Sequence, residues 1–240
     1  MPSAIGGRPF KACIFDLDGT LVDSEPGYYS SDLEFFGPLG IVIDDELNRR
    51  VMGTGTKAYM GILAELFPDN PFCALPLEER IARRDGYYLR HWAPRARAFP
   101  GMAGLVEALH ARGLPLGLAS GSSRAVIDVT LEATGLRPRF SAVLSSEEVA
   151  RGKPYPDIFL GVARRLGVEP GDCLVFEDAP KGLASAKAAE MTCVVLPDPA
   201  LGPADGEAFS AADLIVPGGP GTASADWLLG LVDGLSLRRP

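Results

Sequence analysis

The stretch CIFDLDGTLVDSE, residues 13–25, decides the fold, because an apolar run ends there in two aspartates and a glycine. The apolar residues suit a buried strand, and Gly19 marks a turn directly after it. Asp16 and Asp18 are too close together to remain unneutralised without strong repulsion. An Asx cap would account for one aspartate but not easily for two. The stretch therefore predicts a core strand that carries an acidic pair to the edge of a sheet.

Further short apolar runs bounded by turn residues follow this one, at 114–120, 141–145, 172–178, 191–197 and 213–217. Runs without polar alternation are typical of parallel strands that are covered on both faces. Helix-forming stretches lie between most of them. This alternation predicts an α/β fold with a doubly wound parallel sheet, in which functional sites gather at the carboxyl ends of the strands.

The segment 24–98 interrupts this alternation of strands and helices, because it has helix signals and little strand character. It predicts a helical cap domain, inserted into an α/β core domain made of residues 1–23 and 99–240. Its aromatic residues recur at the spacing of amphipathic helices, so most of them should pack inside the cap. They are Tyr28, Tyr29, Phe35, Phe36, Tyr87, Tyr88 and Trp92.

A second acidic pair, Glu177 and Asp178, ends the run at 172–178. If the two strands are neighbours, this pair lies beside Asp16 and Asp18, and the four acids need a cation. A hard, oxygen-liganded ion such as Mg²⁺ fits best. Asp178 could also cap the helix that opens near Pro180, and this role is compatible with metal binding.

A calcium-binding loop starting at Asp16 does not fit the sequence. Leu21 stands where such a loop needs glycine, and Gly27 stands where it needs the bidentate glutamate.

The run at 114–120 ends in Ser120, and Gly121 and Ser122 follow just before a predicted helix. Backbone amides and a hydroxyl at a helix N-terminus suit a phosphate group. Lys153 likewise lies between a predicted strand and a helix, where a fixed cation makes sense if it faces acids or phosphate. Taken singly, these two motifs are equally compatible with structural roles.

The order of the motifs resembles the haloacid dehalogenase superfamily of phosphotransferases. DLDGT at 16–20, Ser120, Lys153 and the pair at 177–178 each follow a predicted strand, and a helical insert follows the first motif. The likeness is to the phosphatase and β-phosphoglucomutase-like branch with a helical C1 cap. It implies a Mg²⁺-dependent phosphatase that hydrolyses a small phosphorylated metabolite, a sugar phosphate or nucleoside monophosphate, through an aspartyl-phosphate intermediate.

The resemblance also implies a role for each motif residue. Asp16 would be the nucleophile, and Asp18 the general acid/base, which the dehalogenase branch lacks. Ser120 and Lys153 would hold the phosphoryl oxygens, with Gly121 and Ser122 beside them. The metal ligands would be Asp16, the Asp18 main-chain carbonyl and Asp178, with Glu177 close by. Lys153 would also keep Asp16 ionised.

Two alternatives to phosphate hydrolysis stay open. The first is a sugar-phosphate mutase. In β-phosphoglucomutase a histidine stands twelve residues after the nucleophile, but that position here is Tyr28. This departure favours hydrolysis over mutase chemistry. Together, RVMGTGTKAY at 50–59, LVFEDAPKGLASAKAAEM at 174–191 and VVLPDP at 194–199 resemble phosphatases of pseudouridine 5'-phosphate and glycerol phosphate. In that likeness Thr54 to Lys57, with Thr56 and Lys57 among them, would reach from the cap toward the substrate. A catalytically inactive binding protein on the same scaffold is the more remote alternative.

The composition of the chain limits which binding partners and which cellular location are expected. The formal net charge of -8 provides no broad basic face, so neither nucleic acid nor an anionic membrane is expected to bind. No apolar run is long enough for a membrane span, and residues 1–10 lack the core of a signal peptide, so a cytoplasmic monomer or small homo-oligomer is expected. The four cysteines form no C-x-x-C pair and should be reduced and buried.

Overall fold

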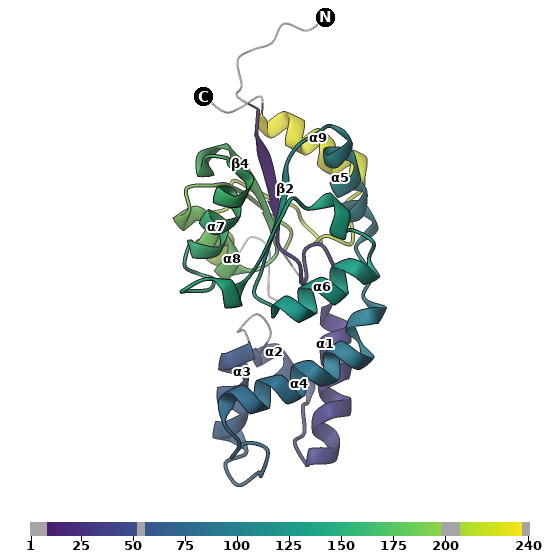
Figure 1. Cartoon of the computed structure of the whole chain (residues 1–240), viewed down its shortest axis with the longest axis vertical. Helices are drawn as coiled ribbons and strands as arrows, with labels where there is room; N and C mark the ends of the chain where they lie inside the picture. Colours follow the sequence, from purple (N-terminus) through teal and green to yellow (C-terminus); the bar gives the residue numbers. More distant parts are fainter. Residues whose placement is uncertain (1–8, 52–55, 198–206, 237–240) are drawn as a thin grey trace, which may run out of the picture.

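A computed structural model describes residues 9–51, 56–197 and 207–236 (Figure 1). Its centre is a six-stranded, wholly parallel sheet in the order β3-β2-β1-β4-β5-β6. The strands are β1 (Ala12–Phe15), β2 (Leu116–Ser120), β3 (Ala142–Ser145), β4 (Cys173–Glu177), β5 (Thr192–Val195) and β6 (Leu214–Ile215). The doubly wound α/β fold expected from the apolar runs is confirmed, and β1 lies near the middle of the sheet.

Apolar side chains cover both faces of the sheet, which is why its strands show no polar alternation. Cys13 and Phe15 of β1 face one hydrophobic cluster, whereas Ala12 and Ile14 face the other. The first cluster includes side chains of α5 (Pro100–Ala111), α6 (Arg124–Ala133) and α9 (Ala225–Ser236). The second includes side chains of α7 (Asp157–Leu166) and α8 (Pro180–Ala188). Figure 1 shows α7 and α8 on one side of the sheet and α5 and α9 on the other.

Four helices lie beyond the carboxyl end of β1: α1 (Glu25–Phe36), α2 (Asp45–Val51), α3 (Thr56–Leu66) and α4 (Leu77–His91) (Figure 1). They enclose a separate hydrophobic cluster, to which Phe36, Met60 and Leu63 contribute fully buried side chains. We propose the cap at 24–98 and the core at 1–23 and 99–240 as the two domains. Single turns of 3-10 helix are η1 (Gly37–Leu39), η2 (Ala93–Arg95), η3 (Arg137–Arg139), η4 (Ser146–Glu148), η5 (Pro170–Asp172) and η7 (Glu207–Phe209).

The aromatic residues of the insert divide into two groups. Tyr29, Phe35 and Phe36 pack inside the cap cluster, as expected. Tyr28, Tyr88 and Trp92 belong instead to a cluster that includes Val126 and Val129 of α6. Packing within the cap alone is therefore the wrong interpretation for these three, because they also join the cap helices to the core domain.

The two chain crossings between sheet and cap lie side by side. Val22 and Ala98 form an antiparallel bridge, flanked by hydrogen bonds from Asp23 N to Arg97 O and from Phe99 N to Leu21 O, each 3.0 Å long. The cap is thus attached directly behind the acidic residues that end β1.

All four cysteines are free and buried. Cys13, Cys173 and Cys193 lie in strands, whereas Cys73 lies in the cap outside any strand. Burial raises the pKa of the Cys193 thiol, which fits an inert structural role. Over the described ranges, none of the helices is both long and apolar enough to cross a membrane.

Candidate active site

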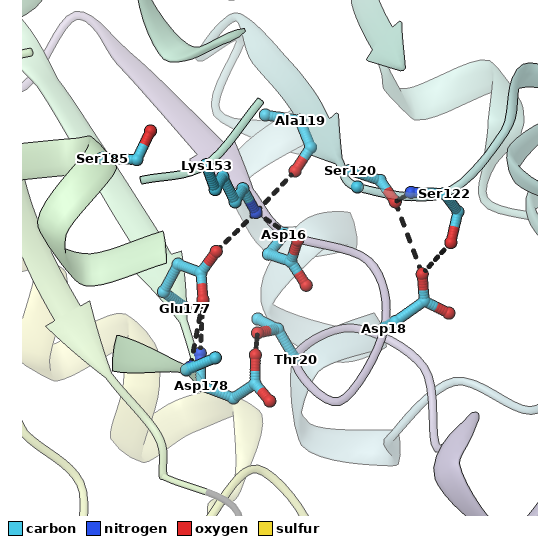
Figure 2. Close-up of polar contacts among 12 residues, drawn as sticks. Asp16, Asp18, Thr20, Ala119, Ser120, Ser122, Lys153, Glu177, Asp178 and Ser185 are labelled. Carbon is cyan, nitrogen blue, oxygen red and sulfur yellow. Dashed lines mark hydrogen bonds and ion pairs between the residues drawn. The ribbon is translucent and has the colours of Figure 1, made fainter. Parts of the chain in front are cut away.

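The register of β1 and β4 brings the two acidic motifs together. Phe15 pairs with Phe176, and Asp16 N donates a 3.0 Å hydrogen bond to Phe176 O. Asp16 and Glu177 therefore leave the same edge of the sheet on adjacent strands. Figure 2 shows their carboxylates on either side of the Lys153 ammonium.

Lys153 comes from the loop between η4 and α7 and is the central cation of the site. Its Nζ donates 2.5 Å hydrogen bonds to Asp16 Oδ1 and Glu177 Oε1, and a 3.1 Å bond to Ala119 O at the end of β2. The Lys153 side chain is 13% exposed, so these pairs are poorly screened by water. One ammonium thus ties together the ends of three strands.

The second oxygen of Glu177 is also engaged. Oε2 accepts hydrogen bonds from Asp178 N at 3.0 Å and Ala179 N at 3.1 Å. The side chain of Glu177 therefore holds the two backbone amides that lead into α8, whose N-cap residue is Ala179. The alternative role left open for Asp178, a helix cap, is wrong, since α8 has no side-chain cap bond at its N-terminus.

Asp178 faces the turn that follows β1. Its Oδ1 accepts a 3.1 Å hydrogen bond from Thr20 Oγ1, and both side chains are buried. Gly19 has a φ of 79°, and a Cβ there would lie 2.4 Å from Asp178 Oδ2. Glycine is therefore required by conformation and by space, which explains why DLDGT turns where it does.

Asp18 lies on the far side of the site, next to the loop that follows β2 (Figure 2). Its Oδ2 accepts a 2.6 Å hydrogen bond from Ser122 Oγ and a longer one, 3.4 Å, from Ser120 Oγ. Its Oδ1 is buried and, among the described residues, has no hydrogen-bond partner. One acceptor of Asp18 is therefore unused by the described residues in this conformation.

The acids outnumber the cation, and the pKa values reflect this excess. Burial raises the pKa of Asp16 to about 8, although Lys153 pulls it down; Glu177 and Asp18 add to the rise. Burial, followed by Glu177 and Asp16, also raises the pKa of Asp178 well above its usual range. The site therefore needs more positive charge than Lys153 alone provides.

The donor set suits a divalent cation. Carboxylate oxygens of Asp16, Glu177 and Asp178 all lie within 4.8 Å of one another, and all three residues are buried. Hard oxygen ligands of this type are those that Mg²⁺ takes. The carboxylate of Asp18 is not part of this group, and the metal ligation expected of its main-chain carbonyl stays a prediction.

A family model described as haloacid dehalogenase-like hydrolase matches residues 10–190 of this chain. The chain belongs to the haloacid dehalogenase-like hydrolases. A probable pseudouridine-5'-phosphatase of Drosophila melanogaster is 35% identical over 201 residues, which cover 81% of this chain and 84% of that relative. Hexitol phosphatase B of Escherichia coli (strain K12) is 31% identical over 197 residues, which cover 80% and 86%.

A solved structure has the same fold. CbbY from Rhodobacter sphaeroides in complex with phosphate matches with a TM-score of 0.76 and 26% identity, over 89% of this chain and 96% of that chain. Like the two named phosphatases, this haloacid dehalogenase-like hydrolase is a phosphoric monoester hydrolase.

The other residues expected at the site of this hydrolase have fewer described contacts with the acidic residues. Ser122 N donates to Ser120 Oγ at 3.0 Å, so one amide expected to hold phosphate already has an acceptor, and Gly121 is exposed. Thr56 opens α3 and Lys57 beside it is exposed. No described contact joins those two to the acids, and Thr54, expected to act with them, lies outside the described residues.

Two contributors to the site were not anticipated. Thr20 was visible in DLDGT, but its bond to Asp178 depends on the meeting of two distant segments. Tyr28 was interpreted as packing, yet its hydroxyl lies 3.2 Å from Ser122 Oγ of the core. Two signals could have drawn attention to it: its place in the first turn of the cap, close behind the acids, and its correspondence to the mutase histidine.

Proposed function

We propose that this enzyme is a Mg²⁺-dependent phosphatase that hydrolyses a small phosphorylated metabolite through an aspartyl-phosphate intermediate. One observation carries the proposal. Asp16 lies between a fixed ammonium, Lys153, and a second carboxylate, Asp18, that keeps one buried oxygen free of hydrogen bonds within the described residues. This arrangement offers a nucleophile, a charge partner and a proton donor around one position.

Asp16 is the proposed nucleophile. Lys153 holds Oδ1, whereas none of the described hydrogen bonds reaches Oδ2. Attack by this oxygen on phosphorus breaks the ester P–O bond and leaves the phosphoryl group on Asp16. Lys153 also lowers the cost of gathering negative charge there, which is the main requirement of phosphoryl transfer.

Asp18 is the proposed general acid/base. In its protonated form it gives its proton to the oxygen of the departing alcohol, and it becomes a carboxylate. In the second step this carboxylate accepts a proton from the water that attacks the phosphorus of the aspartyl phosphate. Inorganic phosphate leaves, and Asp16 and Asp18 return to their initial states.

Asp16, Asp178 and the main-chain carbonyl of Asp18 are the proposed ligands of Mg²⁺. Glu177 is less suited to bind the metal directly, because both of its oxygens already accept hydrogen bonds, one from Lys153 and the other from backbone amides. When bound, the cation supplies neutralisation of the phosphoryl oxygens and of the clustered acids.

The mutase alternative is less well supported. The hydroxyl of Tyr28 is engaged with Ser122, and a phenol whose pKa is raised by burial is a poor proton acceptor where the mutase has a histidine. An inactive scaffold is disfavoured because Asp16, Asp18 and Lys153 are all present and close together.

The names of the relatives support a proposal about the substrate class. The named relatives point to nucleoside monophosphates and hexitol phosphates, and we propose a substrate of this kind. Cytoplasmic location, oligomeric state and the absence of nucleic-acid or membrane partners stay predictions from composition.

The decisive experiment is phosphate release over a panel of phosphate monoesters, with Mg²⁺ and with the metal chelated. We expect Mg²⁺-dependent turnover that Asp16→Asn abolishes. Asp233→Asn on α9, which removes an exposed carboxylate paired with Arg112, is the matched control and should keep full activity. Turnover that survives Asp16→Asn would remove the proposed nucleophile.

A further inference from the structure

A hydroxyl chain connects the cap to the proposed acid/base. Tyr28 Oη of α1 lies 3.2 Å from Ser122 Oγ, and Ser122 Oγ lies 2.6 Å from Asp18 Oδ2. Figure 2 shows the second of these contacts. A single serine hydroxyl therefore separates a cap tyrosine from the carboxylate that handles the proton.

The chemistry of the groups fixes the direction of this chain. A carboxylate oxygen without a proton can only accept, so the Ser122 hydroxyl donates its one proton to Asp18. The Ser122 oxygen is then left as an acceptor, and Tyr28 O–H must be the donor. A hydroxyl that accepts one hydrogen bond becomes a stronger donor in the next, so Tyr28 strengthens the bond between Ser122 and Asp18.

The tyrosine is itself held firmly. Its ring stacks on Tyr88 of α4, with centroids 4.1 Å apart and planes 9° from parallel. The Arg84 guanidinium lies 5.4 Å from its ring centroid, and Arg84 is held by hydrogen bonds of 2.7 and 2.9 Å to Asp32. Two helices of the cap thus determine where the Tyr28 hydroxyl lies.

Asp18 depends on this support because its other contacts are weak. Ser120 Oγ is 3.4 Å from Oδ2, and Oδ1 has no hydrogen-bond partner in the described part of the chain. Ser122 therefore makes the one short bond described for this carboxylate. If that bond weakens, the carboxylate can rotate and Oδ1 loses its fixed direction.

We propose that Tyr28 is a positioning residue, which acts through Ser122 to hold the Asp18 carboxylate ready to protonate the leaving group when the cap is docked on α6. The proposal rests on the proposed function, because it assumes that Asp18 is the general acid. Tyr28 touches neither substrate nor metal in this role. Its hydroxyl matters for catalysis, whereas its ring serves the packing against Tyr88.

The test compares esters that differ in their need for a proton. In Tyr28→Phe the ring and its stacking remain, and only the hydroxyl is lost. For the alkyl phosphate that the wild-type enzyme hydrolyses best, kcat/KM should fall about three- to tenfold, the value of one hydrogen bond. For p-nitrophenyl phosphate, whose leaving group departs without protonation, kcat/KM should change by less than about twofold, since no proton has to be delivered.

Two further variants separate positioning from packing. Ser122→Ala removes the middle of the chain and should show the same preference for the aryl ester, and the double variant should lose little more than Ser122→Ala alone. Tyr87→Phe is the matched control, because its hydroxyl bonds Glu34 within the cap at 3.0 Å and should not affect either ester.

Equal losses with both esters, no loss with either, or fully additive losses in the double variant would overturn the role of Tyr28. Failure of the proposed function looks different: the wild-type enzyme itself would hydrolyse no ester, or its turnover would survive Asp16→Asn.

Discussion

Gly182 lies so close to Glu177 that a Cβ built on it would be 1.8 Å from Glu177 Oε1. The glycine belongs to the first turn of α8, and its lack of a side chain provides the space for the carboxylate that holds Lys153. A residue outside the acidic motifs thus determines whether the central cation is correctly placed.

Gly182→Ala should therefore reduce activity strongly. The methyl group must displace Glu177, and with it the Lys153 ammonium beside Asp16. We expect kcat to fall at least about tenfold, since small misplacements of catalytic groups are costly. Gly230→Ala in α9 is the matched control, because a Cβ there meets nothing within 4 Å. Full activity in Gly182→Ala would mean that the site does not need Glu177 in this position.

Binding of Mg²⁺ should release protons. Burial holds the pKa of Asp16 at about 8 in the metal-free protein, so Lys153 alone does not keep this carboxyl ionised, contrary to the expectation from the sequence, and it is largely protonated at pH 7. The cation requires the ionised form, so its affinity should fall as the pH drops below about 8. Calorimetry in two buffers of different ionisation enthalpy measures the number of protons released. Proton uptake on binding, or affinity that does not change between pH 6 and pH 8, would contradict the prediction.

Asp16 should also make the metal-free protein less stable as the pH rises. Folding raises its pKa from the ordinary value of 3.8 to about 8, because the carboxyl becomes buried, so between these pH values the folded state holds a proton that the unfolded state has lost. The contribution to stability is complete below pH 3.8 and declines until about pH 8. Urea unfolding of the metal-free protein, compared between wild type and Asp16→Asn at pH 5 and pH 8, measures it. Between pH 5 and pH 8 the unfolding free energy of Asp16→Asn should rise relative to that of wild type, because only wild type loses the contribution of Asp16. A difference that is the same at both pH values would argue against the raised pKa.

The ion pair of Arg84 and Asp32 should be important for the stability of the cap. Its side chains are 8% and 6% exposed, so Arg84→Met leaves a buried carboxylate without its cationic partner. We expect a loss of about 3–5 kcal/mol in unfolding free energy. Arg112→Met, which breaks the exposed pair with Asp233, is the control and should cost about 1 kcal/mol or less. Adding Asp32→Leu to Arg84→Met should restore part of the loss, and purely additive losses would argue against the pair.

Much of the fold follows from local patterns. Apolar runs without alternation predicted the parallel strands, because a strand covered on both faces needs no polar side. Spacing and length likewise predicted the helices of the insert. The exact ends were less predictable, as in β6, where only Leu214–Ile215 pair within the expected run at 213–217.

The site was predictable where residue type alone limits the chemistry. Asp16, Asp18 and the pair at 177–178 stand out because clustered acids need a cation wherever they lie. The sequence could not reveal that Glu177 serves Lys153, because that contact joins residues 24 positions apart. The bonds of Glu177 to the two amides that follow it are local, but they depend on how the chain turns ahead of α8. The same holds for Tyr28, whose role depends on how the cap docks.

The bridge between Val22 and Ala98 has a consequence for how such an enzyme can change. Because the chain leaves and returns at neighbouring points, the whole insert closes a loop whose ends are already held together, and changes in its length cost little chain entropy. Residues between the two crossings can be shortened, extended or exchanged while the strands that carry Asp16 and Asp178 keep their register. Apart from residues such as Tyr28 that reach the core, the insert can therefore evolve, or be engineered, separately from the strands that carry the chemistry.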